Sequence, residues 1–203
     1  VGNADDQIRH AVTKLAHIHL TTNSESKERV LRLGEQEFRV HNVGNPGLDR
    51  LVKVETLSLA QISRNINFEV AEDEPYIILI QHPLSSEIKD AYRQMKITLD
   101  AIKAMGIKTI ISFPNSDAGG LEIIRAIAEY DSVPFIYSAK NIPRVDFVNL
   151  LRNAACLVGN SSSGILEAPL LKLPVINIGN RQIGRLHAEN VQFVPHEKSA
   201  IIG

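Results

Sequence analysis

Short apolar runs alternate with helical patterns along most of the chain beyond residue 75. The runs have the length and the Ile- and Val-rich character of buried parallel strands, and they lie at residues 76–80, 109–113, 134–137, 156–158 and 174–178. The periodicity between them predicts helices at residues 86–105, 120–130, 144–153 and 163–171. Five strands joined by helices predict a doubly wound, Rossmann-like α/β domain, whose parallel sheet is linked by right-handed crossovers.

The first 70 residues follow a different pattern. Helical periodicity at residues 6–15 and 24–33 alternates with strand-like runs at 17–21 and 40–43, and a turn at 44–49 leads into a further helix. We interpret residues 1–45 as the tail of a preceding Rossmann-like domain and residues 46–203 as a second domain. The chain begins at Val1, and its first residues resemble a loop inside a larger protein, so we expect a fragment.

Composition and charge narrow the class of protein. The 203 residues are 44% hydrophobic and 22% charged, which is typical of a globular protein. The net charge of −1 gives no electrostatic reason to expect nucleic acid or an anionic membrane as a partner. No run approaches the roughly 20 apolar residues of a membrane span. Cys156 is the only cysteine, so no intrachain disulfide can form, and we expect a cytoplasmic protein in a reducing compartment.

The loop after the fourth apolar run has the character of an anion-binding site. The strand ends in Asn-Ser-Ser-Ser-Gly at residues 160–164, and a helix is predicted to start there with Glu167 in its first turn. Free backbone N–H groups and the helix dipole favour an anion at such a position. Arg181 and Arg185 follow the next strand and carry guanidinium groups suited to phosphate oxygens. An ordinary helix cap followed by a surface loop is the alternative.

Polar residues follow each of the predicted strands. Because the carboxyl ends of parallel strands meet at one edge of a sheet, we expect these loops to lie together at the ligand-binding edge. His82 ends the first buried strand, and Pro83 keeps it out of a helix. Such a histidine can act as an acid, a base or a phosphate ligand, and a hydrogen-bonded structural histidine is equally compatible with the pattern.

Other candidates lie near the start of the chain. Asp5 and Asp6, together with Arg9 and His10, place two carboxylates, a cation and an imidazole within about one helical turn. They form either a proton-transfer group or a capped helix start with surface ion pairs. Arg64 is placed on a polar-faced helix, where an exposed arginine is the simplest interpretation.

Several common chemistries lack their motifs. His17 and His19 alternate on a strand without a Cys or acidic partner at ligand spacing, so no metal site is predicted. The chain contains no GxxxxGK[ST] loop, no GxGxxG and no GxSxG. Kinase, dinucleotide-binding and hydrolase-elbow interpretations therefore lose support.

Six motifs occur in order across nearly the whole chain. They are DDQIRHAVTKLAHIHL (residues 5–20), VGNPGLD (43–49), QHP (81–83), FPNSDAG (113–119), GNSSSG with a following Glu (159–167) and PVINIGNRQIGR (174–185). Together they resemble the hydrolysing UDP-N-acetylglucosamine 2-epimerases, which are bacterial enzymes that make N-acetylmannosamine for sialic acid and the epimerase half of a bifunctional animal enzyme.

The resemblance implies an architecture and a reaction. The family has the two-domain GT-B fold, with the nucleotide held mainly by the C-terminal domain. Its enzymes eliminate UDP from UDP-GlcNAc to give 2-acetamidoglucal, and addition of water then gives N-acetylmannosamine. The resemblance therefore implies a UDP-sugar substrate, no cofactor, and a homodimer or homotetramer.

The same resemblance assigns catalytic residues. His82 matches the family's catalytic histidine beside the diphosphate, and Arg64 falls where the family has an active-site arginine. Asp5 and Asp6 match an acidic pair, one member of which takes part in proton transfer.

It also assigns residues to UDP. Ser161 and Ser162 match the phosphate-binding loop, and Glu167 matches the carboxylate that holds the ribose hydroxyls. Arg181 matches an arginine that contacts the nucleotide, and Ile142 lies in the segment whose backbone reads the uracil.

The extent of the chain relative to the family, together with three alternatives, completes the expectation. The family's first domain would lie upstream of Val1 and its last helices beyond Gly203, so we expect this chain alone to bind UDP weakly and not to turn over. The alternatives are a hydrolysing 2-epimerase for UDP-2,4-diacetamido-2,4,6-trideoxyglucose, a GT-B glycosyltransferase, and a non-catalytic nucleotide-sugar binding module.

Overall fold

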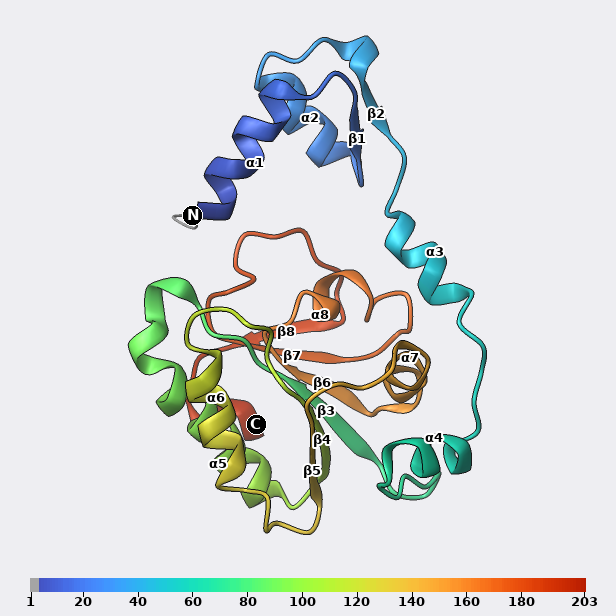
Figure 1. Ribbon diagram of the computed structural model, residues 1–203, viewed down its shortest axis with the longest axis vertical. Coiled ribbons are helices and arrows are strands. Elements are labelled where there is room, and N and C mark those ends of the chain that lie inside the picture. Colours follow the sequence, from blue (N-terminus) through green and yellow to red (C-terminus); the bar gives the residue numbers. More distant parts are fainter. Residues whose placement is uncertain (1–3) are drawn as a thin grey trace. The chain divides into compact units, whose positions relative to one another are not determined.

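The chain divides into two compact units, Val1–Lys53 and Val54–Gly203 (Figure 1). The computed structural model describes the backbone of residues 4–203 and the side chains of residues 7–203. The expected domain boundary after residue 45 falls just before helix α3 (Pro46–Val52), which the division into compact units groups with the first unit. Within residues 4–203, no helix combines the length and the apolar character needed to cross a bilayer.

The first unit is a small α/β arrangement around two parallel strands. Strand β1 (His19–Thr21) pairs in parallel with β2 (Val40–Asn42), with His19 opposite Val40. The remaining elements are α1 (Ala4–Leu15), α2 (Ser24–Arg32), the 3₁₀ helix η1 (Glu37–Arg39) and α3. Asparagine side chains cap two of these helices: Asn23 accepts from the Ser26 N–H at α2, and Asn45 accepts from the Gly47 N–H at α3.

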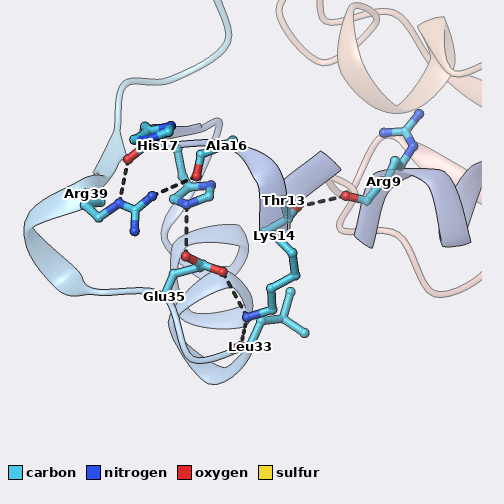
Figure 2. Close-up of polar contacts among 9 residues, drawn as sticks. Arg9, Thr13, Lys14, Ala16, His17, Leu33, Glu35 and Arg39 are labelled. Carbon is cyan, nitrogen blue, oxygen red and sulfur yellow. Dashed lines mark hydrogen bonds and ion pairs between the residues drawn. The ribbon is translucent and has the colours of Figure 1, made fainter. Parts of the chain in front are cut away.

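A group of polar contacts ties α1 to the segment around β1 and β2 (Figure 2). Lys14 Nζ lies 2.9 Å from Glu35 Oε1, and the other Glu35 oxygen lies 3.3 Å from His19 Nε2. Arg39 donates from Nε to the His17 carbonyl (2.6 Å) and from Nη2 to that of Ala16 (2.8 Å). The hydrogen bond from Lys14 holds the pKa of Glu35 below its usual range.

The second unit is built on a six-stranded parallel sheet with the order β5-β4-β3-β6-β7-β8. The strands are β3 (Tyr76–Ile80), β4 (Lys108–Ser112), β5 (Ile136–Ala139), β6 (Cys156–Gly159), β7 (Val175–Ile178) and β8 (Val191–Val194). The five expected strands are present within two residues of their expected limits, and β8 is a sixth strand that the sequence pattern did not predict. The predicted doubly wound α/β fold is confirmed.

Two apolar layers cover the two faces of this sheet. Along β3, Ile77 and Leu79 face a core shared with α5 (Ala91–Met105), α6 (Gly120–Ala128) and α9 (Lys198–Ile202). Tyr76, Ile78 and Ile80 face the opposite core, which contains α4 (Leu59–Ile66) and α7 (Arg144–Asn153). Figure 1 shows α5 and α6 on one side of the sheet and α7 on the other. Strand side chains alternate in direction, so a strand buried on both faces is apolar throughout.

Two expected helices are corrected by the structure. The segment expected as one helix from residue 86 begins as the 3₁₀ helix η2 (Ser85–Asp90), which is interrupted at Glu87 (φ −126°), and α5 follows. The helix expected at 163–171 is only α8 (Ser163–Leu166) and then continues as turns. Pro169 has no N–H to donate to the Ile165 carbonyl four residues earlier, so a regular helix cannot pass through it.

Candidate functional site

The strand order reverses between β3 and β6, and we call the region outside the carboxyl ends of these two strands the crevice. From β3 the chain builds β4 and β5 on one side, and it then returns to build β6, β7 and β8 on the other. Parallel sheets bind ligands at this point of reversal, because the loops leave the two central strands in opposite directions. His82 lies two residues beyond the end of β3, and Asn160 directly follows β6.

Asn160 joins these two strand ends. Its Oδ1 accepts a hydrogen bond from the His82 backbone N–H at 2.7 Å, and its Nδ2 donates to the His82 carbonyl at 2.9 Å. The Asn160 backbone N–H donates to the carbonyl of Ile80 at 3.0 Å. Asn160 is only 4% exposed, so its amide satisfies backbone groups at a strand end that has little access to water.

Residue 159, directly before Asn160, must be glycine. Gly159 has φ of +122°, and a Cβ there would lie 2.1 Å from the carbonyl oxygen of Ile80. Only a residue without a side chain lets the end of β6 approach β3 this closely. Gly159 therefore makes the contact between Asn160 and His82 possible.

The carbonyl of Asn160 brings in the loop after β7. It accepts from Arg181 Nη1 at 3.1 Å and from Gln182 Nε2 at 2.8 Å. Gln182 is 1% exposed, and its Oε1 accepts from Arg185 at 2.8 Å. Burial lowers the pKa of Arg181, with Asp117 opposing this effect and Arg185 adding to it. An arginine remains charged under these conditions, so the crevice holds a half-buried cation.

His82 lies in the electrostatic field of this cation. Burial lowers the pKa of His82, Arg181 lowers it further, and the carboxylate of Asp117 opposes both effects. The Asn115 backbone N–H donates to His82 Nδ1 at 3.4 Å. The loops after β3, β4 and β7 therefore meet at this imidazole. A neutral imidazole beside a guanidinium suits binding of a polyanion, because an incoming negative charge would favour protonation of the histidine.

The serine loop lies beside Asn160. Ser161 and Ser162 are half-buried, the Ser161 hydroxyl accepts from the Ser163 N–H at 3.3 Å, and Ser162 makes no side-chain cap bond to α8. Glu167 follows α8 as its C-cap instead of lying in its first turn, which corrects the expected placement. The Glu167 Oε1 lies 3.0 Å from Arg144 Nη2, at the first residue of α7.

A pocket of about 520 Å³ lies among the loops after β4 and β5 and the start of α6. Asn115 and Asp117 contribute to its lining and also act on His82, and Lys140 supplies a cation after β5. The rest of its lining is Phe113, Pro114, Ser116, Gly120, Leu121 and Ile124. No group of three or more His, Cys, Asp or Glu side chains gathers as a metal site in the described part of the chain.

The remaining predicted site residues lie apart from these contacts. Ile142 is half-buried at the start of the segment leading into α7 and packs against the core beside α7. Arg64 is exposed in the last turn of α4 and takes no part in the contacts described around His82. Asp5 and Asp6 are part of the backbone of α1, and their side chains lie outside the described residues.

Three residues at the crevice were not predicted as site residues: Asn160, Gln182 and Asp117. Each lies in a polar loop after a predicted strand, so their position at the edge was a usable signal. Their partners depend on the strand order, which places β6 beside β3. Such cross-strand bonds follow from the sheet topology rather than from local pattern.

Comparison with known proteins decides the family. The family model described as UDP-N-acetylglucosamine 2-epimerase matches residues 1–203. The chain belongs to the UDP-N-acetylglucosamine 2-epimerase family. This confirms the resemblance carried by the six motifs.

Relatives of this epimerase-family chain include two bacterial enzymes. It is 35% identical over 201 residues to a UDP-N,N'-diacetylbacillosamine 2-epimerase (hydrolyzing) of Legionella pneumophila, covering 99% of this chain and 53% of the relative. It is 32% identical over 200 residues to a UDP-N-acetylglucosamine 2-epimerase of Neisseria meningitidis, covering 98% and 52%. The chain spans about half the length of the curated relatives it matches.

The fold is shared with solved members of the family. The crystal structure of the Neisseria meningitidis UDP-GlcNAc 2-epimerase bound to UDP-GlcNAc superposes with a TM-score of 0.74 at 19% identity, covering 94% of this chain and 52% of that one. The α/β fold of GT-B type expected from the sequence is confirmed by this likeness.

Proposed function

We propose that this chain carries the UDP-binding and diphosphate-handling part of a hydrolysing UDP-sugar 2-epimerase. The observation that carries the proposal is the single hydrogen-bonded group in which Asn160 joins His82 to Arg181 beside the serine loop. It assembles a cation, an imidazole and hydroxyl groups at the edge where parallel sheets bind nucleotides. Relatives over 30% identical include enzymes named for this chemistry.

Each residue has a role in the proposed binding mode. Arg181 and the loop containing Ser161 and Ser162 would hold the diphosphate, and Glu167 would accept hydrogen bonds from the ribose hydroxyls. The backbone around Ile142 would read the uracil. In this binding mode the β-phosphate would lie next to His82.

The proposed reaction is an elimination followed by a hydration. The C2 proton of the sugar leaves to a base, the C1–O bond breaks, and UDP departs with that oxygen, leaving 2-acetamidoglucal. Water then adds its hydroxyl to C1, and C2 receives a proton on the face opposite to the one from which the original proton left. The product is the 2-epimer. Arg181 would stabilise the charge that develops on the departing diphosphate, and His82 would hold or deliver a proton there. Asp5, Asp6 and Arg64 are proposed as further catalytic groups.

The sugar is open between two candidates, and each has an observation in its favour. UDP-GlcNAc is favoured by the family description and the Neisseria relative. A UDP-2,4-diacetamido-2,4,6-trideoxy sugar is favoured by the Legionella relative. The identities of 35% and 32% are too similar to decide between them.

Two experiments test the proposal. The purified 203-residue chain is titrated with UDP while amide resonances are followed by NMR, and the largest shifts are expected at residues 160–163 and 181–182. A full-length protein containing the chain is incubated with each sugar nucleotide in deuterated water. Free UDP with a 2-epimerised sugar carrying deuterium at C2 supports the proposal, and binding without reaction would leave a nucleotide-sugar binding module. Transfer of the sugar to an acceptor would make it a glycosyltransferase.

A further inference from the structure

We propose that Arg144 is a positioning residue that fixes the Glu167 carboxylate, and thereby sets a preference for ribonucleotides over 2'-deoxyribonucleotides. The inference rests on the proposed role of Glu167 as the group that accepts from the ribose hydroxyls. It adds a residue that neither the sequence motifs nor the catalytic set contains.

The contact joins two parts of the nucleotide site that are distant in sequence. Arg144 Nη2 lies 3.0 Å from Glu167 Oε1, across 23 residues of chain. Arg144 follows directly on the segment around Ile142 that is proposed to read the base, and Glu167 follows the serine loop. The ion pair therefore lies between the proposed base-reading and phosphate-binding segments, at the position of the proposed ribose.

The backbone on the arginine side is held firmly. Asp146, in the same helical turn as Arg144, is 5% exposed and accepts from Asn65 Nδ2 at 2.7 Å. Val148 and Leu150 in α7 are fully buried. The first turn of α7 is therefore fixed against the core, and the Arg144 side chain extends from a firmly held backbone.

The backbone on the glutamate side is equally constrained. The Glu167 N–H donates to the Ser163 carbonyl at 2.9 Å, and the Glu167 carbonyl accepts from the Leu170 N–H at 3.1 Å. The next residue, Ala168, is fully buried. A glutamate side chain still has three rotatable bonds, so its carboxylate needs a partner to select one orientation.

The hydrogen-bonding capacity of the carboxylate leaves room for a ribose. Arg144 is bonded to Oε1, which leaves Oε2 and its lone pairs to accept from two neighbouring hydroxyls. The Arg144 side chain is 46% exposed and that of Glu167 is 18% exposed. An ion pair as open as this contributes little to folding stability, so its removal is expected to change binding geometry more than the fold.

The test compares UDP with 2'-deoxy-UDP as ligands of the 203-residue chain, with affinities measured by NMR titration. Wild type, R144M, R144K, E167A and the double variant R144M/E167A are compared. Loss of one well-placed hydrogen bond corresponds to about a fivefold change in affinity, so R144M is expected to weaken UDP binding about fivefold and 2'-deoxy-UDP binding less than about twofold. R144K is expected to retain most of the preference. In the E167A background, R144M is expected to have no further effect.

A matched control removes an ion pair elsewhere. Arg32 Nη2 lies 3.4 Å from Glu28 on α2, and R32M is expected to leave both affinities unchanged. An equal loss of affinity for UDP and 2'-deoxy-UDP in R144M would overturn the positioning role of Arg144 while leaving the proposed function intact. An undiminished effect of R144M in the E167A background would do the same. Failure of the wild-type chain to bind UDP at millimolar concentration would overturn the proposed function itself.

Discussion

His82 is the residue at which the electrostatics of the crevice are most directly measurable. Burial and the Arg181 cation hold its pKa below the ordinary value of 6.5, and Asp117 acts against them. We expect R181M to raise the His82 pKa and D117N to lower it further, because each substitution removes one charge next to the imidazole. UDP should raise the same pKa, since its diphosphate places negative charge there.

An NMR titration of the histidine ring resonances measures this shift, with H82Q used to assign the signal. An unchanged His82 pKa in both R181M and D117N would mean that burial alone sets its value. A lower pKa on addition of UDP would contradict binding of the diphosphate at this imidazole.

Asn160 is expected to be the most sensitive polar side chain of the crevice. N160A leaves the N–H and the carbonyl of the half-buried His82 without their partner, the nearly buried Asn160 amide. Each unsatisfied buried group costs about 1 to 3 kcal/mol, so we expect the free energy of unfolding to fall by about 2 to 4 kcal/mol in total. Urea denaturation followed by circular dichroism measures the loss.

Asn153 provides the matched control for N160A. It is exposed, and its Nδ2 donates to the Asn149 carbonyl at 2.7 Å. N153A should change the free energy of unfolding by no more than about 0.5 kcal/mol, as is usual at the surface. Similar losses in both variants would show that the bonds from Asn160 to His82 have no special weight.

At the scale of single residues, the sequence indicated the side chains that would bind the nucleotide better than it indicated the residues that hold those side chains in place. His82, Arg181 and the serines were visible because their residue types suit anions and because they follow predicted strands. The joining role of Asn160 was not visible, because asparagine is common in loops and its partners come from another strand end.

Among the elements, the junction between β3 and β6 depends on one glycine. A Cβ at residue 159 would lie 2.1 Å from the Ile80 carbonyl oxygen, and φ there is +122°. G159A must therefore displace one strand end and also adopt a strained backbone, and we expect a loss of at least about 3 kcal/mol in the free energy of unfolding. Loss of UDP binding should accompany it.

Gly106 provides a control that separates backbone strain from the steric clash expected for G159A. It has φ of +65° at the end of α5, and a Cβ there would meet nothing within 4 Å. G106A should lower the free energy of unfolding by only about 1 kcal/mol. This is the usual cost of alanine at a helix C-terminus where the backbone lies in the left-handed region. Equal losses in G106A and G159A, measured by urea denaturation, would contradict the close-contact argument.

The elements themselves were largely predictable, and the failures have local causes. Strand β3 is a continuous apolar run that is buried throughout, and β4, β6 and β7 each have a mostly buried apolar stretch, which is a strong strand signal in such a sheet. Strand β8 has the sequence VQFV, in which the exposed Gln192 leaves only two consecutive apolar residues, so no apolar run stands out there. The shortening of α8 could have been read from Pro169.

On the scale of the whole molecule, the acid sensitivity of the first unit is expected to depend on Glu35. Lys14 holds the folded-state pKa of Glu35 below the ordinary value of 4.5. A depressed carboxyl pKa contributes stability above the unfolded value, and this contribution is lost as the pH falls through the folded value. E35Q should therefore destabilise residues 7–53 at pH 7, and the difference from wild type should shrink below about pH 4.

Amide resonances of β1 and β2 followed during urea titration at pH 7 and pH 3.5 measure this difference. K14M serves as the companion variant, because it removes the largest cause of the lowered pKa while leaving the carboxylate in place. A difference between E35Q and wild type that is the same at both pH values would contradict the link to ionisation of Glu35.

The two compact units are expected to differ widely in local stability. Among the described residues of the first unit, Val40 and Leu51 are the buried apolar side chains, whereas β3 alone buries five. Ile8, Val12 and Leu15 of α1 are 59%, 58% and 81% exposed. A sheet of two three-residue strands is marginal without a larger apolar layer, because burial of apolar surface supplies most of the stability of a domain.

Hydrogen exchange measured by NMR should therefore show opening of β1 and β2 at a free energy at least about 3 kcal/mol below that of β3 and β6. Saturating UDP should raise the protection of β3 and β6 through mass action, by about 2.7 kcal/mol at a hundred times the dissociation constant. The protection of β1 and β2 should not change if that unit opens independently. A single opening free energy for all four strands, raised equally by UDP, would instead mean that the units unfold together.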